Sequence, residues 1–149
     1  MAQSLARVLI HIVFSTRDRK PWLDDTIRAD THAYLVGVAN SEHVVVRVGG
    51  VADHVHLAIF LSRTDTIAKL VERLRVSSTK WIKAKGPEFE KFAWQKGYAV
   101  FSVGLTDKAA LTQYIDTQAA HHRQRDFQAE MRAMFAKYDV PFDERFVWD

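Results

Sequence analysis

Two histidines separated by one residue, in Asp53-His54-Val55-His56-Leu57, are a first candidate for chemistry in this sequence. On a β-strand, side chains at i and i+2 leave the same face, about 6 to 7 Å apart along the chain. Two imidazoles can therefore converge on one metal ion. Because the chain has no cysteine, any metal must be held by histidines, carboxylates or amides. The alternative is a pair of ordinary polar residues on a half-exposed strand.

Tyr114 and Gln118 form a second candidate pair. A spacing of four on a helix places the phenol and the amide on one side, where a nucleophile and a neutral oxygen ligand could serve the same metal. The alternative is an aromatic core residue followed by a surface glutamine. His121 and His122 follow three and four residues later, and one of them shares the face of Gln118. We expect a surface or packing role for both, and likewise for His11.

The elements that must position these residues alternate between strand and helix patterns. Runs rich in Val, Ile and Phe predict strands at residues 8–15, 44–48, 55–61 and 98–103. Apolar residues at helical spacing predict helices from Asp24 to Asn40, from a cap at Asp65 to Gly86, and from 106 towards 122. A last helix is expected from near Asp126. The Gly49-Gly50 pair between the second and third strands predicts an antiparallel hairpin.

The order strand, helix, strand, strand, helix, strand, helix, followed by a C-terminal helix, predicts an α+β fold. We expect a ferredoxin-like antiparallel sheet with its helices packed mainly on one face. The chain has 149 residues, 48% of them apolar, and contains no repeat or flexible linker. These features predict a single domain over residues 1–149. On the histidine-bearing strand, the alternate residues are apolar and can be buried against the helices, which leaves the histidines on the other face.

Five segments extend this pattern along nearly the whole chain: His11-Ile12-Val13-Phe14-Ser15-Thr16, Asp53-His54-Val55-His56-Leu57, Trp94-Gln95-Lys96-Gly97-Tyr98, Phe101-Ser102-Val103, and Tyr114-Ile115-x-x-Gln118 followed by His121-His122. In this order they resemble the single-tyrosine HUH (His-hydrophobe-His) transposases encoded by the smallest bacterial insertion sequences, the insertion-sequence-200-like family. The chain does not depart from the family pattern at the two histidines, the tyrosine or the glutamine.

The resemblance implies a role for each of these residues. His54 and His56 would be metal ligands, Gln118 would complete the metal site, and Tyr114 would attack a DNA phosphodiester to form a 5′-phosphotyrosine while a 3′-hydroxyl leaves. The protein would then be a DNA strand transferase that cleaves and rejoins single-stranded DNA at the ends of an insertion element. The family implies Mg²⁺ or Mn²⁺, whereas imidazole ligands alone leave Zn, Cu, Fe and Ni open. It also implies a homodimer, in which active sites can be shared between subunits.

The expected partner is single-stranded or hairpin DNA. A formal charge of +3 and a pI of about 9.3 give a mild basic bias that suits a polyanion. For any single basic residue, ordinary solvated charge is the alternative to a phosphate contact. The candidate DNA-binding residues are Arg17, Arg19, Lys20, Lys80, Lys83 and Lys85.

Three other functions remain as alternatives to the transposase. The first is a catalytically inactive or domesticated DNA-binding protein of the same fold, against which the intact candidate residues argue. The second is a metal-dependent phosphodiester hydrolase in which the ion activates water and Tyr114 only orients the substrate. The third is a replication-initiation or conjugative nickase, which the short chain disfavours. The sequence begins without a signal peptide and has no membrane-spanning run, so we expect a cytoplasmic protein without a membrane partner.

Overall fold

A four-stranded antiparallel sheet forms the centre of the computed structural model, which describes residues 2–122 and 125–149. The strands are β1 (Leu9–Ser15), β2 (Val44–Gly50), β3 (His54–Phe60) and β4 (Ala99–Val103). They lie in the order β2-β3-β1-β4, and every neighbouring pair is antiparallel. The predicted hairpin is confirmed, because β2 pairs directly with β3. This strand order is the one expected for a ferredoxin-like sheet.

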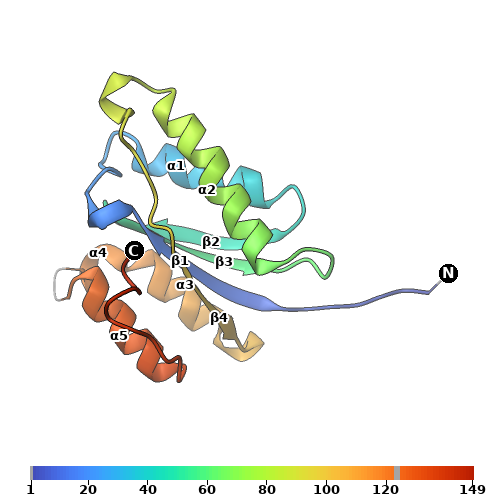
Figure 1. Cartoon of the computed structure of the whole chain (residues 1–149). Helices are drawn as coiled ribbons and strands as arrows, with labels where there is room; N and C mark the ends of the chain where they lie inside the picture. The colour runs from blue at the N-terminus through green and yellow to red at the C-terminus, as the bar shows by residue number, and fades with distance from the viewer. Residues whose placement is uncertain (1, 123–124) are drawn as a thin grey trace.

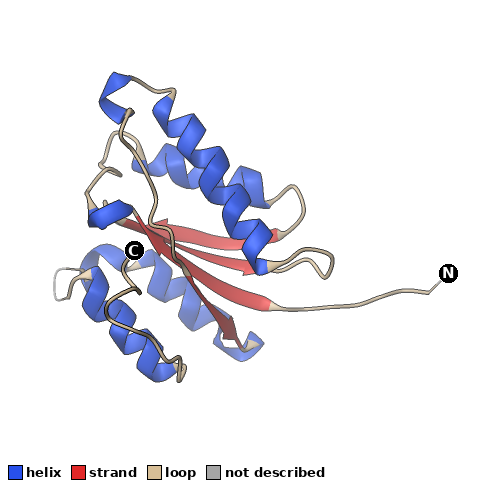
Figure 2. Cartoon of the chain, viewed as in Figure 1, coloured by secondary structure: helices blue, strands red, loops and turns tan. Residues whose placement is uncertain are grey.

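Helices cover both faces of the sheet (Figure 1). The crossover helices α1 (Arg28–Ala39) and α2 (Ile67–Lys83) lie on one face, and α3 (Lys108–Asp116), α4 (Gln118–His121) and α5 (Phe127–Lys137) lie on the other. Short 3-10 helices at Arg17–Arg19, Pro87–Phe89 and Leu105–Asp107 lie in the connections (Figure 2). In the described part of the chain, no helix has both the length and the apolar character needed to cross a bilayer.

The two faces of β3 explain this arrangement. Val55, Leu57 and Ile59 point into the main core beneath α1 and α2. Ala58 and Phe60, on the other side of the strand, pack with residues of α3. All seven residues of β3 are buried, so both faces of the strand need a covering layer. The α+β class and the order of elements are therefore confirmed, but the helices are divided between the two faces more evenly than we expected.

Several helix boundaries differ from the predictions. Helix α1 begins at Arg28, after Ile27, and not at a cap formed by Asp24. The cap of α2 is Thr66, whose hydroxyl accepts a hydrogen bond from the Lys69 amide, and not Asp65. Asp65 instead bonds His43, at a distance of 2.8 Å, and Arg73. The helix expected from 106 towards 122 is interrupted at Thr117, whose φ of −105° and ψ of 21° separate α3 from α4.

Candidate active site

The two histidines of β3, called the HUH pair below, lie on the face of the sheet covered by α3, α4 and α5. His54 and His56 are both 0% exposed. Nδ1 of His54 lies 2.7 Å from Oδ1 of Asp53, and Nδ1 of His56 lies 2.8 Å from Nε2 of His11 on the adjacent strand β1. Because the Nδ1 atoms are occupied, both rings present Nε2 towards the helices. His11, for which we expected only a packing or surface role, is thus a direct partner of the pair.

Gln118, the first residue of α4, reaches the same point. Its Oε1 lies 3.1 Å from Nε2 of His54 and 3.1 Å from Nε2 of His122. Gln118 is 1% exposed. The amide oxygen is therefore held among imidazole nitrogens by the segment that follows the break at Thr117. His122 also belongs to this cluster, although the sequence favoured a surface or packing role for it.

Tyr114 lies on α3, directly beside the pair. Its ring centroid is 5.7 Å from that of His56 and 6.2 Å from that of His11. Helix α3 is held against the sheet by Leu111 and Ile115, which pack on the apolar residues of β1 and β3. The predicted residues Tyr114, Gln118 and the HUH pair are thus brought together by β3, α3 and α4 within one chain.

A carboxylate that the sequence analysis did not identify lies at the centre of the cluster. Glu130, on α5, is 2% exposed. Its Oε1 lies 3.2 Å from Nε2 of His56 and 3.5 Å from Nε2 of His54. Its Oε2 accepts a hydrogen bond of 2.6 Å from the Tyr114 hydroxyl and lies 3.2 Å from Nε2 of His122. One buried side chain therefore contacts both histidines of the pair and the candidate nucleophile.

Burial and the neighbouring carboxylates set the charges of the histidines. Burial lowers the pKa of His56 to about 4, and burial together with His56 lowers the pKa of His11 well below its usual value. Burial opposes a charge on His54 too. The hydrogen bonds that His54 donates to Asp53 and Glu130 outweigh it, however, and raise the pKa of His54 to about 9. The HUH pair therefore contains one imidazole that favours the charged form and one that favours the neutral form.

The pKa values of the Glu130 carboxyl and the Tyr114 phenol are shifted in opposite directions. Burial disfavours a charge on Glu130, but hydrogen bonds from His122 and the HUH pair outweigh it and hold the pKa of Glu130 well below its usual range. Burial, and then the Glu130 carboxylate, raise the pKa of Tyr114 above its usual value. At neutral pH the site therefore contains an ionised Glu130 and a protonated Tyr114 that donates to it.

A cavity of about 610 Å³ opens beside this cluster, between β4, α3 and α5. Tyr114, Glu130 and His11 are among the residues that line it, and Arg125 and Lys137 contribute positive charge. A phosphate group entering this cavity would meet the Tyr114 hydroxyl with basic side chains close by. The candidate nucleophile therefore borders a cavity that also contains two basic side chains.

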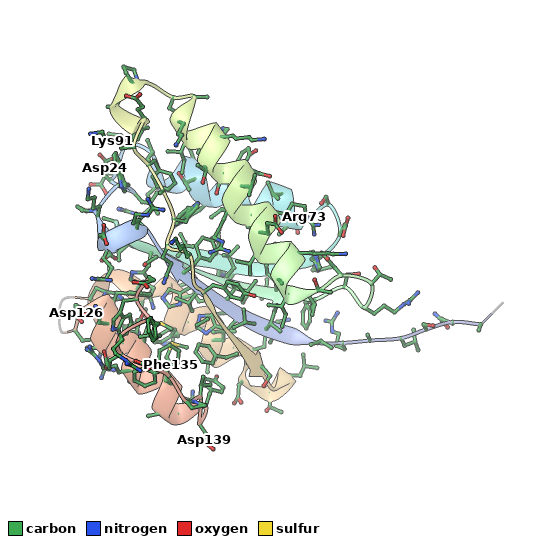
Figure 3. All side chains as sticks on the ribbon, viewed as in Figure 1. Asp24, Arg73, Lys91, Asp126, Phe135 and Asp139 are labelled. Carbon is green, nitrogen blue, oxygen red and sulfur yellow. The ribbon has the colours of Figure 1, made fainter. Side chains whose placement is uncertain are left out.

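The predicted DNA-binding residues lie elsewhere. Arg17, Lys80 and Lys83 line an open groove of about 630 Å³ between α2 and residues 92–96, together with Arg75 and Lys96. This groove is on the α2 side of the molecule, where Figure 3 labels Arg73 and Lys91. Asp126, the cap of α5, and Phe135 of α5 mark the side of the HUH pair. The other three candidates, Arg19, Lys20 and Lys85, do not line the groove.

The donor atoms of the cluster fit a divalent cation. Ligand atoms of His54, His122 and Glu130 lie within 4.8 Å of one another, and Nε2 of His56 and Oε1 of Gln118 point to the same place. Imidazole nitrogen, amide oxygen and carboxylate oxygen together suit a cation of intermediate hardness such as Mn²⁺, and the oxygens suit Mg²⁺. The combination of a ferredoxin-like sheet, a buried histidine pair and an adjacent tyrosine defines the class of HUH nucleic-acid enzymes that the sequence resembled.

Comparison with known proteins identifies the family. The sequence profile described as "Transposase IS200 like" matches residues 4–118, and the chain belongs to this family. The structure of a candidate transposase from Deinococcus radiodurans R1 is 23% identical, with a TM-score of 0.61, and the match covers 79% of this chain and 98% of that one. The REP-associated tyrosine transposase bound to a REP hairpin is 14% identical, with a TM-score of 0.60, and the match covers 82% of this chain and 74% of that one. No curated protein matches the chain.

These findings confirm the family and the fold expected from the sequence, and with them a transposase. At such low identities, the two structures establish the fold alone. The family match ends at residue 118, so it includes the HUH pair, Tyr114 and Gln118 but not Glu130.

Proposed function

We propose that this transposase cleaves and rejoins single-stranded DNA at the ends of an insertion element, with Tyr114 as the nucleophile. The observation that carries the proposal is the meeting of Tyr114, Gln118 and the HUH pair, which come from three separate elements. A merely structural tyrosine would not need two buried imidazoles and a buried carboxylate beside its hydroxyl. Buried polar groups of this kind are costly unless they serve a site.

In the proposed reaction, the Tyr114 oxygen attacks the phosphorus of a phosphodiester. A new bond joins that oxygen to the 5′-phosphate, and the bond to the 3′-oxygen breaks. The phenol loses one proton and the departing 3′-oxygen gains one, so the step is neutral overall. Because the phosphotyrosine bond replaces the phosphodiester, a free DNA 3′-hydroxyl can later attack it and reseal the strand. This chemistry permits cutting and joining by one tyrosine.

We propose His54, His56 and Gln118 as ligands of a Mg²⁺ or Mn²⁺ ion. Such an ion, when bound, stabilises the negative charge that develops on the phosphate oxygens during displacement. The side chains of the site also orient one another without the ion. The Asp53 carboxylate orients the ring of His54, His11 orients the ring of His56, and Glu130 fixes the direction of the Tyr114 hydroxyl.

The proposed DNA partner is a hairpin or a single strand. The structural neighbour that binds a REP hairpin supports this choice. Arg17, Lys80 and Lys83 are proposed phosphate contacts because they line one groove. Family resemblance further supports a homodimer. Since Tyr114 and the HUH pair meet within one chain, we propose that each subunit of such a dimer contains a complete site.

The test is formation of a covalent protein–DNA adduct. Purified protein is incubated with Mn²⁺ or Mg²⁺ and labelled single-stranded DNA from the ends of its element, and the products are separated on a denaturing gel. We expect a labelled adduct with the wild type and none with Tyr114→Phe. Tyr138→Phe is the matched control, because Tyr138 lines the same cavity and loses the same atom. Cleavage without an adduct would instead identify the hydrolase, and DNA binding without cleavage would identify the inactive binding protein.

A further inference from the structure

Glu130 has a contact pattern that packing does not require. Its carboxylate is 2% exposed, although α5 presents it among the apolar residues Phe127, Met131 and Phe135. A buried carboxyl group is costly unless charged or hydrogen-bonding groups surround it. Among the residues that the structure describes, every partner of the carboxylate belongs to the candidate active site. Glu130 is therefore connected to the chemistry of the site rather than to the core.

The two oxygens of Glu130 face different partners. Oε1 faces the Nε2 atoms of the HUH pair, at 3.2 and 3.5 Å, on the side where Gln118 also presents its Oε1. Oε2 faces the Tyr114 hydroxyl, at 2.6 Å, and His122. One oxygen is thus directed towards the proposed metal position, and the other holds the nucleophile.

We infer that Glu130 is an anionic ligand of the divalent cation through Oε1, and that Oε2 of the same carboxylate positions the Tyr114 hydroxyl beside it. This inference rests on the proposed function and adds a ligand from α5, an element outside the family match. It makes α5 a part of the active site rather than a C-terminal appendage. It also makes one carboxylate the link between the metal position and the nucleophile.

Charge explains why such a ligand is needed. Two imidazoles and an amide are neutral ligands, so a site made of them alone would hold a divalent cation without any compensating charge. Mg²⁺ and Mn²⁺ prefer oxygen ligands, and carboxylates above all. Asp53 is the other nearby carboxylate, but it bonds Nδ1 of His54, on the side of the ring away from the cluster. Glu130 supplies the negative charge at the point where the donor atoms converge.

The position of Glu130 is fixed by its helix. Asp126 caps α5 through a 2.8 Å bond from the Ala129 amide, immediately before Glu130. Phe127, Met131 and Phe135 anchor the same helix to Val13 and Phe101 of the sheet. The carboxylate is therefore held on a packed element, as a preorganised ligand should be.

The test measures metal binding without DNA, so its outcome is separable from that of the adduct assay. Binding of Mn²⁺ is followed by the electron paramagnetic resonance signal of the free ion, for the wild type, Glu130→Gln and Glu90→Gln. Glu130→Gln keeps the shape of the side chain and removes its charge. Glu90→Gln makes the same change at an exposed residue outside the site. His54→Ala, which removes one of the proposed ligands, is included for comparison.

We expect Glu130→Gln to weaken Mn²⁺ binding by about tenfold or more and Glu90→Gln to leave it unchanged. Wild-type affinity in Glu130→Gln, or no binding of Mn²⁺ by the wild type, would overturn the inference. Should Glu130→Gln fail to fold, as judged by circular dichroism, a crystal of the wild type with Mn²⁺ decides. Oε1 within about 2.5 Å of the ion supports ligation, and an ion bound by the HUH pair with Glu130 turned away refutes it.

Discussion

Replacing Gly49 by alanine should displace the helix that carries Tyr114. Gly49 lies on β2, opposite His56 in the register of the sheet. A Cβ atom at this position would lie 2.7 Å from Cγ2 of Ile115 and 2.7 Å from its backbone oxygen. Because one of these atoms belongs to the backbone of α3, a change of rotamer cannot relieve the clash. The helix itself must move away from the sheet.

The size of the effect follows from this distance. Ordinary contact begins at 3.4 Å, so α3 must retreat by about 3.4 − 2.7 = 0.7 Å. Overpacking of this kind costs about 1–3 kcal/mol, and removal of a glycine from a strand offsets about 0.5–1 kcal/mol of it. We therefore expect a net loss of about 1–2 kcal/mol in the free energy of unfolding. Because Tyr114 precedes Ile115 on α3, its hydroxyl moves as well, and adduct formation should slow by about tenfold or more.

Urea unfolding and the rate of adduct formation measure the two effects separately. Gly37→Ala is the matched control, because a Cβ at this exposed position of α1 meets no atom within 4 Å. That variant should be more stable by about 0.5–1 kcal/mol and react at the wild-type rate. If Gly49→Ala reacts as fast as the wild type and is equally stable, the close approach of β2 and α3 does not position the nucleophile.

Three further predictions concern other parts of the molecule. Burial would raise the pKa of Asp65, but hydrogen bonds to its histidine and arginine partners outweigh it and lower this pKa from 3.8 to about 2. The ionised carboxylate therefore contributes about 1–2 kcal/mol to the free energy of unfolding. This contribution is present above pH 4 and is lost as the pH falls through 2. Urea unfolding should therefore show Asp65→Asn to be less stable than the wild type at pH 6 but nearly equal to it at pH 2; a difference that is constant with pH would contradict this. A mixture of His54→Ala and Tyr114→Phe should form no adduct, because both residues belong to one site within a chain, whereas restored activity would show exchange between subunits. Lys80→Glu combined with Lys83→Glu should weaken hairpin binding by about tenfold or more in a gel-shift titration and reduce its salt dependence, and unchanged binding would exclude the groove.

The strands and the HUH pair could be predicted from sequence because they depend on short-range patterns. Alternation along β3 placed its two histidines on one face, and Gly49 and Gly50, which form the end of β2, predicted the hairpin. The spacing of Tyr114 and Gln118 also predicted that they lie together. That spacing is retained across a break at Thr117, because the chain turns back into helix immediately. The break lies at Thr117 because α4 packs over the HUH pair. The spacing of residues along the sequence does not encode this packing.

The contact between Asp65 and His43 illustrates a different limit. Asp65 and Thr66 are adjacent, and both are good capping residues, so sequence alone cannot choose between them. The structure favours Thr66 because His43, 22 residues away in sequence, accepts the amide hydrogen bond of Ser62 and engages Asp65 with its other nitrogen. Competition of this kind between local and distant partners is decided by the tertiary fold.

Glu130 shows how a functional residue can be hidden by an apolar pattern. Phe127, Met131 and Phe135 repeat every four residues and form the buried face of α5. Glu130 lies on that same face, where a charge is unfavourable unless the facing surface is polar. The surface facing it is the histidine side of β3, which was predicted to carry a metal site. A lone carboxylate on the apolar stripe of a helix, in a chain whose sheet presents two histidines, is therefore the signal that could have assigned α5 to the site before its structure was known.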